Sequence, residues 1–177
     1  MTFTGSKYDK NLTTTDIAKR FRADVKEAVQ QGELPRMKVS VRTRYFSGGS
    51  SIDVAVQRIE GVDRIVNPEA LRLAVQDPHG FNRVPRLAPE VEAVRAQLER
   101  MLRAYNYDNS DITSDYFCVR FYAHVEVVMN WDAELERARA QMTADPAEHQ
   151  TAPRVRDAST PPTNVVSLSA WRSDRDR

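Results

Sequence analysis

The strongest constraint on the fold is a strict alternation of side chains on both sides of a glycine-rich turn. In residues 36–45, one set of alternate positions is mostly apolar, and the other set carries four cations with no acid among them. Turn-forming residues follow at 46–51, and residues 52–57 alternate again. Because successive side chains of a strand point to opposite faces, the pattern predicts a β-hairpin with one apolar and one polar face.

Helical periodicity precedes the hairpin. Apolar side chains recur at helical spacing from Ile17 to Val29, which predicts an amphipathic helix. Thr14 or Thr15 is expected to cap its start, and Gly32 to end it. The same pattern predicts three further helices, over 67–76, 89–105 and 130–142.

Residues 116–127 alternate between apolar and polar side chains, which predicts a long third strand. The resulting order, α-β-β-α-α-β-α, is typical of an α+β domain. We expect a small, mainly antiparallel sheet of about three strands, with the apolar helix faces packed on one side of it.

The composition changes towards the end of the chain. Residues 143–177 hold four of the nine prolines and many Ser, Thr, Asp and Arg residues, without helical or strand periodicity. We therefore expect a folded domain over 8–142 and a disordered tail over 143–177, whose deletion leaves the fold intact. A short apolar island at 165–171 interrupts the tail, and it is a chance cluster, a stretch that docks on its own domain, or a linear motif for a partner.

The charge and cysteine content exclude several classes of site and partner. Lys and Arg total 26 against 25 for Asp and Glu, so any basic surface must be local. The single cysteine excludes an internal disulfide and a cysteine-based zinc site. No apolar run approaches the roughly 20 residues of a membrane span, and the N-terminus lacks a signal-peptide core, so we expect a cytoplasmic protein with no membrane partner.

The polar faces of the three predicted strands combine into a basic surface if the strands share one sheet. Cations on such a surface neutralise phosphates, and exposed tyrosines stack on bases, so the surface suits nucleic acid or an acidic protein. The alternative is a solvated face whose charges protect an edge strand, or a face covered by the helix over 130–142. The candidate binding residues are Arg36, Lys38, Arg42, Arg44, Arg120, Tyr116 and Tyr122, with His124 beside them and Asp53 as a counter-charge.

An acidic loop supports a different hypothesis, a metal-dependent enzyme that acts on nucleic acid or nucleotides. Asp108, Asp111 and Asp115 supply oxygen ligands, but they lack the spacing of a calcium-binding loop, and such residues commonly cap turns. The three histidines lie far apart, and no nucleophile or phosphate-loop motif is present. We therefore expect no enzyme activity, and we assign no catalytic residue, metal or cofactor.

Three phrases together resemble a known family. They read TTTDIAKRFRADVKEAV, MKVSVRTRYFSGGSSIDVAV and YNYDNSDITSDYFCVRFYAHVEV, and the match runs from about Tyr8 to Val128. They resemble the twenty-ninth of the numbered large polyvalent-protein-associated domains, which are found in phages, plasmids and conjugative elements. The resemblance implies an accessory α+β module that travels with invading DNA and counters host defence, such as restriction or CRISPR. It supplies no catalytic residues.

Overall fold

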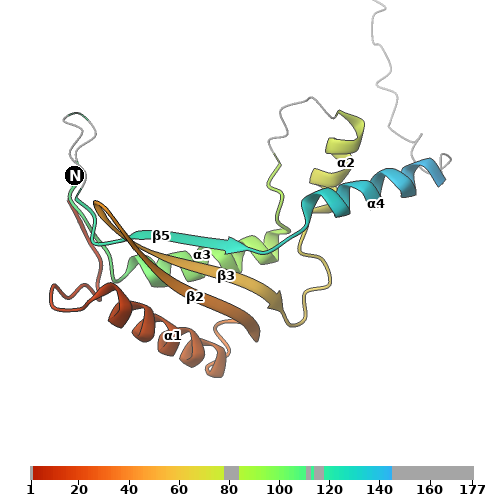
Figure 1. Ribbon diagram of the computed structural model, residues 1–177. Helices are drawn as coiled ribbons and strands as arrows, with labels where there is room; N and C mark the ends of the chain where they lie inside the picture. The colour runs from red at the N-terminus through yellow and green to blue at the C-terminus, as the bar shows by residue number, and fades with distance from the viewer. Residues whose placement is uncertain (1, 78–83, 111–112, 114–117, 145–177) are drawn as a thin grey trace, which may run out of the picture. The chain divides into compact units, whose positions relative to one another are not determined.

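The alternating hairpin forms two strands of a three-stranded sheet in the computed structural model, which describes residues 2–77, 84–110, 113 and 118–144 (Figure 1). Strand β2 (Met37–Phe46) pairs antiparallel with β3 (Gly49–Ile59), and β3 pairs in parallel with β5 (Tyr122–Val127). The strand order is therefore β2-β3-β5. Among the strands that the structure describes, this order leaves β2 with one unpaired edge.

The hairpin turn is short. Phe46 pairs with Gly49, so Ser47 and Gly48 alone connect the strands. Gly48 has a φ of 95°, a conformation that side-chain-bearing residues rarely adopt. Further along the hairpin, the register shifts between Lys38 and Val39, which marks a β-bulge.

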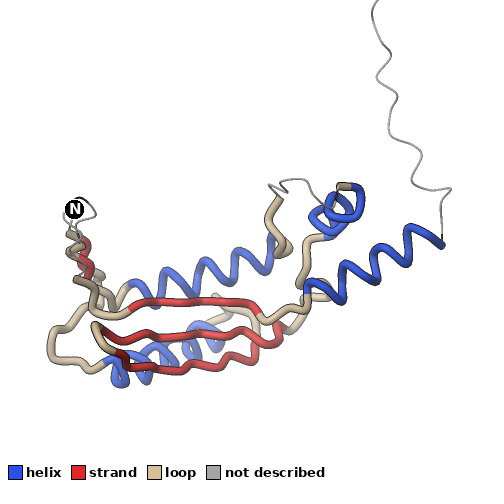
Figure 2. The backbone as a smooth tube through the Cα atoms, turned by 45° about the horizontal axis from the view of Figure 1, so that its top comes forward, coloured by secondary structure: helices blue, strands red, loops and turns tan. Residues whose placement is uncertain are grey.

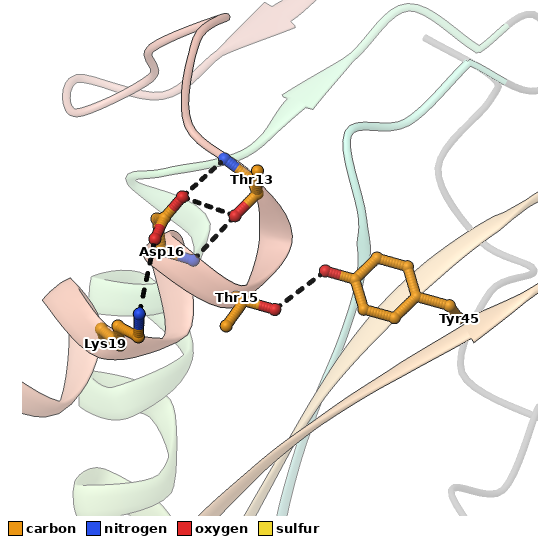
Figure 3. A network of polar contacts seen from close by, with 5 residues as sticks. All are labelled: Thr13, Thr15, Asp16, Lys19 and Tyr45. Atoms are coloured by element: carbon orange, nitrogen blue, oxygen red, sulfur yellow. Dashed lines mark hydrogen bonds and ion pairs between the residues drawn. The ribbon is translucent and has the colours of Figure 1, made fainter.

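Helix α1 (Thr14–Gln30) begins at a reciprocal capping box (Figure 3). The backbone N–H of Asp16 donates to the Thr13 hydroxyl at 3.1 Å, and the backbone N–H of Thr13 donates to the Asp16 carboxylate at 3.4 Å. These bonds satisfy backbone donors that a helix start otherwise leaves open. The cap is therefore Thr13, one residue before Thr14, the nearer of the two predicted caps. The helix ends before Gly32, whose φ is 77°, as predicted.

The other three helices are confirmed close to their predicted bounds. The Asn67 side-chain oxygen accepts the Glu69 N–H at 3.0 Å at the start of α2, and the Asn130 side-chain oxygen accepts the Ala133 N–H at 3.2 Å at the start of α4. The helices are α2 (Pro68–Gln76), α3 (Pro89–Arg103) and α4 (Trp131–Ala144).

The hydrophobic core lies between one face of the sheet and helices α1 and α3 (Figures 1 and 2). Strand β3 contributes the alternate apolar positions that the sequence indicated. The largest fully buried side chains are Phe21, Phe121, Ile17, Ile52, Leu98, Leu102, Val54, Val56 and Val91. Because both helices cover the same face, the opposite face of the sheet, here called the outer face, is left to the polar side chains.

A short segment before the predicted domain start is part of the fold. Strand β1 (Phe3–Thr4) pairs with β4 (Tyr107–Asp108), and the Gly5 N–H donates to the Asn106 carbonyl at 2.8 Å. A Cβ on Gly5 would lie 2.2 Å from the Ala104 carbonyl oxygen, so only glycine fits this approach. The compact unit that contains the sheet runs to Gln141 and starts before residue 8.

The α+β class is confirmed, and two details of the sheet differ from prediction. The β3–β5 pair is parallel, because two helices intervene between these strands and return the chain to the same end of the sheet. The third strand is also shorter than residues 116–127. Before Tyr122, the chain turns to β4 instead, where the Arg120 N–H donates to the Tyr107 carbonyl at 2.8 Å. The tail beyond 144, with its 165–171 island, lies outside the described residues.

Candidate functional site

The outer face brings together side chains from all three strands. The register aligns Arg42 with Asp53 and His124 in one row across the sheet. The next row aligns Arg44 with Ser51 and Tyr122. These rows alternate with the buried Ile52 and Val54 of β3, so their side chains point away from the core.

Positive charge predominates on the outer face. Four cations stand against two carboxylates among the described residues; they are Lys38, Arg42, Arg44 and Arg58, against Asp53 and Glu126. Lys38 pairs with Arg58 at the bulge, and both are exposed. Such a surface attracts polyanions, although the chain as a whole is almost neutral.

One ion pair crosses the middle of this surface. The Arg44 Nε lies 2.9 Å from the Asp53 Oδ2, with the Arg44 side chain 71% exposed and that of Asp53 26% exposed. Because the Arg44 side of this pair is open to solvent, we expect the pair to contribute little to stability, about 0–1 kcal/mol. Lys38 and Arg42 form no ion pair with any residue that the structure describes, so both are available to an anionic ligand.

Two aromatic rings lie beside Arg44 at the turn end of the sheet. The ring centroids of Phe46 and Tyr122 are 5.8 Å apart, with an angle of 37° between the ring planes. Gly49 lies beneath them: a Cβ there would be 3.3 Å from Tyr122 and 3.5 Å from Phe46. Both rings are solvent-accessible, Phe46 by 50% and Tyr122 by 38%. The absent side chain of Gly49 therefore leaves room for an exposed aromatic pair.

The neighbouring tyrosine has a different orientation and role. The hydroxyl of Tyr45 lies 3.0 Å from that of Thr15 on α1 (Figure 3). Tyr45 thus points to the helix side of the sheet and is not part of the outer face.

Two predicted site residues are placed elsewhere. Arg120 precedes β5, and its guanidinium donates to the carbonyls of Leu12 and, at 3.2 Å, Lys10, so it fastens the segment before α1 instead of facing a ligand. Arg36 precedes β2 and lines a groove beside α1. Neither residue lies on the outer face where the sequence placed it, because the alternation was extended beyond the ends of the actual strands. Tyr116 lies outside the described residues.

The acidic loop is described only in part. Asp108 accepts the Ser110 N–H at 2.9 Å, and the hydrogen bonds from Ser110 lower the pKa of the Asp108 carboxyl. This is the turn-capping role that the sequence also suggested. Asp111 and Asp115 lie outside the described residues. Within the described ranges, no three His, Cys, Asp or Glu side chains are grouped as a metal site would require.

The alternating pattern misses Phe46 and Arg58. Phe46 is predicted as part of the turn, although it continues the alternate positions of Arg42 and Arg44. A strict alternation along β3 would place Arg58 on the buried face, with Val54 and Val56. The bulge shifts the register so that Arg58 pairs with Lys38, which places it on the outer face.

Comparisons of the chain with family models, with curated proteins and with solved structures found no match. The resemblance to the polyvalent-protein domains therefore stays a prediction. In the part of the chain that the structure describes, no helix is both long and apolar enough to cross a membrane.

Proposed function

We propose that this chain is a non-enzymatic accessory protein that binds single-stranded nucleic acid on the outer face of its sheet. The observation that carries the proposal is the exposed Phe46–Tyr122 pair, which lies beside Arg44 on a face that also carries Lys38 and Arg42 and that no described helix covers.

Each part of this surface fits one part of a single strand. Lys38 and Arg42 offer positive charge to phosphates, which releases condensed counterions and makes binding depend on salt. Phe46 and Tyr122 offer ring surface to unpaired bases, at about 1–3 kcal/mol for each stacked base. Bases within a duplex are already stacked on each other, so the aromatic pair favours a single strand.

The resemblance to mobile-element domains supplies a setting for this activity. A module that accompanies invading DNA meets nucleic acid on entry, and a bound strand is shielded from host enzymes. An anti-restriction or anti-CRISPR role is a hypothesis on that basis.

The test is fluorescence anisotropy of labelled single- and double-stranded DNA and RNA over a series of salt concentrations. We expect the single strands to bind more tightly, with affinity falling steeply as salt rises. The double variant Lys38→Gln/Arg42→Gln should weaken binding and flatten the slope by about 0.7 for each phosphate that is no longer neutralised. Arg100→Gln on α3 removes an exposed cation from another surface and is the control.

Absence of binding to every nucleic acid at low salt would reject the proposal. If the protein then bound polyglutamate, and the Lys38→Gln/Arg42→Gln variant did not, the outer face would be assigned to an acidic protein partner instead.

A further inference from the structure

A second candidate site lies at the free edge of β2, on the helix side of the sheet. Helix α1 and strand β2 enclose a groove of about 510 Å³. Five apolar side chains line it: Val25, Val29, Met37, Val39 and Val41. Four of them, Val25 excepted, are only partly buried against the core. The groove is therefore an apolar surface that is left incompletely covered beside the edge of β2 that no described strand pairs with.

The backbone of β2 adds hydrogen-bonding groups to this surface. The Arg36 carbonyl accepts the Glu60 N–H at 2.8 Å, so the backbone N–H and C=O groups of the even-numbered residues point towards β3. The backbone groups of successive strand residues alternate in direction, so those of the odd-numbered residues point to the free edge. In agreement, the Arg22 guanidinium of α1 donates to the Val41 carbonyl. Val39 and Thr43 thus present their N–H and C=O groups at the edge.

The charged side chains that line the groove are all positive. Arg22, Lys26 and Arg36 line it, and no carboxylate does. Lys26 and Arg36 form no ion pair among the described residues. This pattern disfavours a second copy of the same edge, which would bring like charges together. It favours a ligand that combines carboxylates with apolar side chains.

We propose that this edge receives an extended acidic and apolar peptide segment of a partner protein, which pairs with β2 as a fourth strand. Alternate apolar side chains of the peptide fill the groove, while its backbone pairs with Val39 and Thr43. Carboxylates near the ends of the peptide meet Lys26 and Arg36. The Arg22 guanidinium, which occupies one edge carbonyl in the free protein, turns to a peptide carboxylate. This site is separate from the outer face and does not depend on nucleic-acid binding.

The test uses the full chain and the labelled peptide Glu-Asp-Val-Asp-Val-Asp-Val-Glu-Asp. We expect it to bind, to shift the amide resonances of Val39 and Thr43, and to slow their hydrogen exchange. A version with lysine in place of each acid should not bind. A version with backbone N-methyl groups along one edge should bind much more weakly, because it cannot complete the strand pairing.

Charge-reversal variants separate the groove from the rest of the surface. Lys26→Glu/Arg36→Glu should weaken peptide binding about tenfold, in keeping with the loss of two exposed ion pairs. Arg100→Glu, a reversal on α3, is the control and should have no effect. The circular dichroism spectrum of each variant should match that of the parent.

Three results would overturn the proposal. Equal binding of the N-methylated peptide would exclude strand pairing. Resonance shifts confined to β5 would place the peptide on another surface. Binding of dodecanoate in the groove without any binding of the peptide would assign the site to an anionic amphiphile.

Discussion

Phe46 and Tyr122 come from strands that are not neighbours in the sheet, yet their ring centroids lie 5.8 Å apart. The rings meet across β3, where Gly49 has no side chain to separate them. The central strand thus provides the space, and the two edge strands provide the aromatic groups. The arrangement buries neither ring, so its contribution to folding is small compared with that of a core pair.

Removal of either ring should therefore reduce binding more than stability. We expect Phe46→Ala and Tyr122→Ala each to weaken single-stranded DNA binding about 5- to 150-fold, which corresponds to about 1–3 kcal/mol for a stacked base. The slope of log affinity against log salt should be unchanged, because every cation is retained. Anisotropy titrations check both quantities. Tyr45→Ala is the control on the same strand but the opposite face, and an equal loss in that variant would argue against a stacking role.

A carboxylate within a phosphate-binding surface should oppose binding. Asp53 lies in the central strand, and its Oδ2 is 2.9 Å from the Arg44 Nε. We expect Asp53→Asn to tighten binding of single-stranded DNA several-fold, because it removes a negative charge and releases Arg44 to the ligand. The melting temperature should change little, since an ion pair whose Arg44 side is open to solvent contributes about 0–1 kcal/mol. Weaker binding in this variant would show that the outer face does not hold phosphates.

Arg120 should affect stability and not binding. Its guanidinium donates to the Leu12 and Lys10 carbonyls, and Arg120→Ala would leave both groups without this charged donor. Hydrogen bonds to charged groups contribute about 1.5–3 kcal/mol, and we expect the free energy of unfolding to fall by about that amount. Urea denaturation measures this decrease. If the folded variant instead bound DNA with a flatter salt slope, Arg120 would belong to the interface after all.

The local elements of the fold were predictable, because each depends on the side chains within it. The alternation in 36–45 and the apolar spacing from Ile17 to Val29 are confirmed as β2 and α1. The parallel pairing of β3 with β5 was not predictable in this way. It depends on where two intervening helices return the chain, and that is a long-range property of the packing.

The candidate site was predictable where strand alternation holds and not at the strand ends. Lys38, Arg42, Arg44 and Tyr122 lie on the outer face as predicted. Arg36 and Arg120 do not, because β2 begins at Met37 and β5 begins at Tyr122. A bulge and a strand end each change the direction of a side chain, and neither feature leaves a clear mark in the alternating pattern.

The buried phenol of Tyr105 should make the stability of the fold fall at alkaline pH. Tyr105 is 4% exposed, and its hydroxyl donates to the Asp24 Oδ2 at 2.7 Å, an oxygen that also lies 2.6 Å from the Lys7 Nζ. Burial, followed by the hydrogen bond to Asp24, raises the pKa of the Tyr105 phenol well above its ordinary value of 10.0. Well below pH 10 the phenol is neutral in both the folded and the unfolded chain. Above pH 10 it ionises first in the unfolded chain, so unfolding releases a proton and the free energy of unfolding decreases as the pH rises.

Tyr105→Phe should separate this effect from the other groups that titrate at alkaline pH. Near neutral pH we expect the variant to be less stable by about 1 kcal/mol, because it lacks the hydrogen bond to Asp24. Above pH 10 its stability should decrease less steeply than that of the parent. Urea denaturation at several pH values between about 8 and 11 measures both effects. Tyr45→Phe removes an exposed phenol and should keep the steep parental decrease, and an equally steep decrease in Tyr105→Phe would show that the buried phenol is not its source.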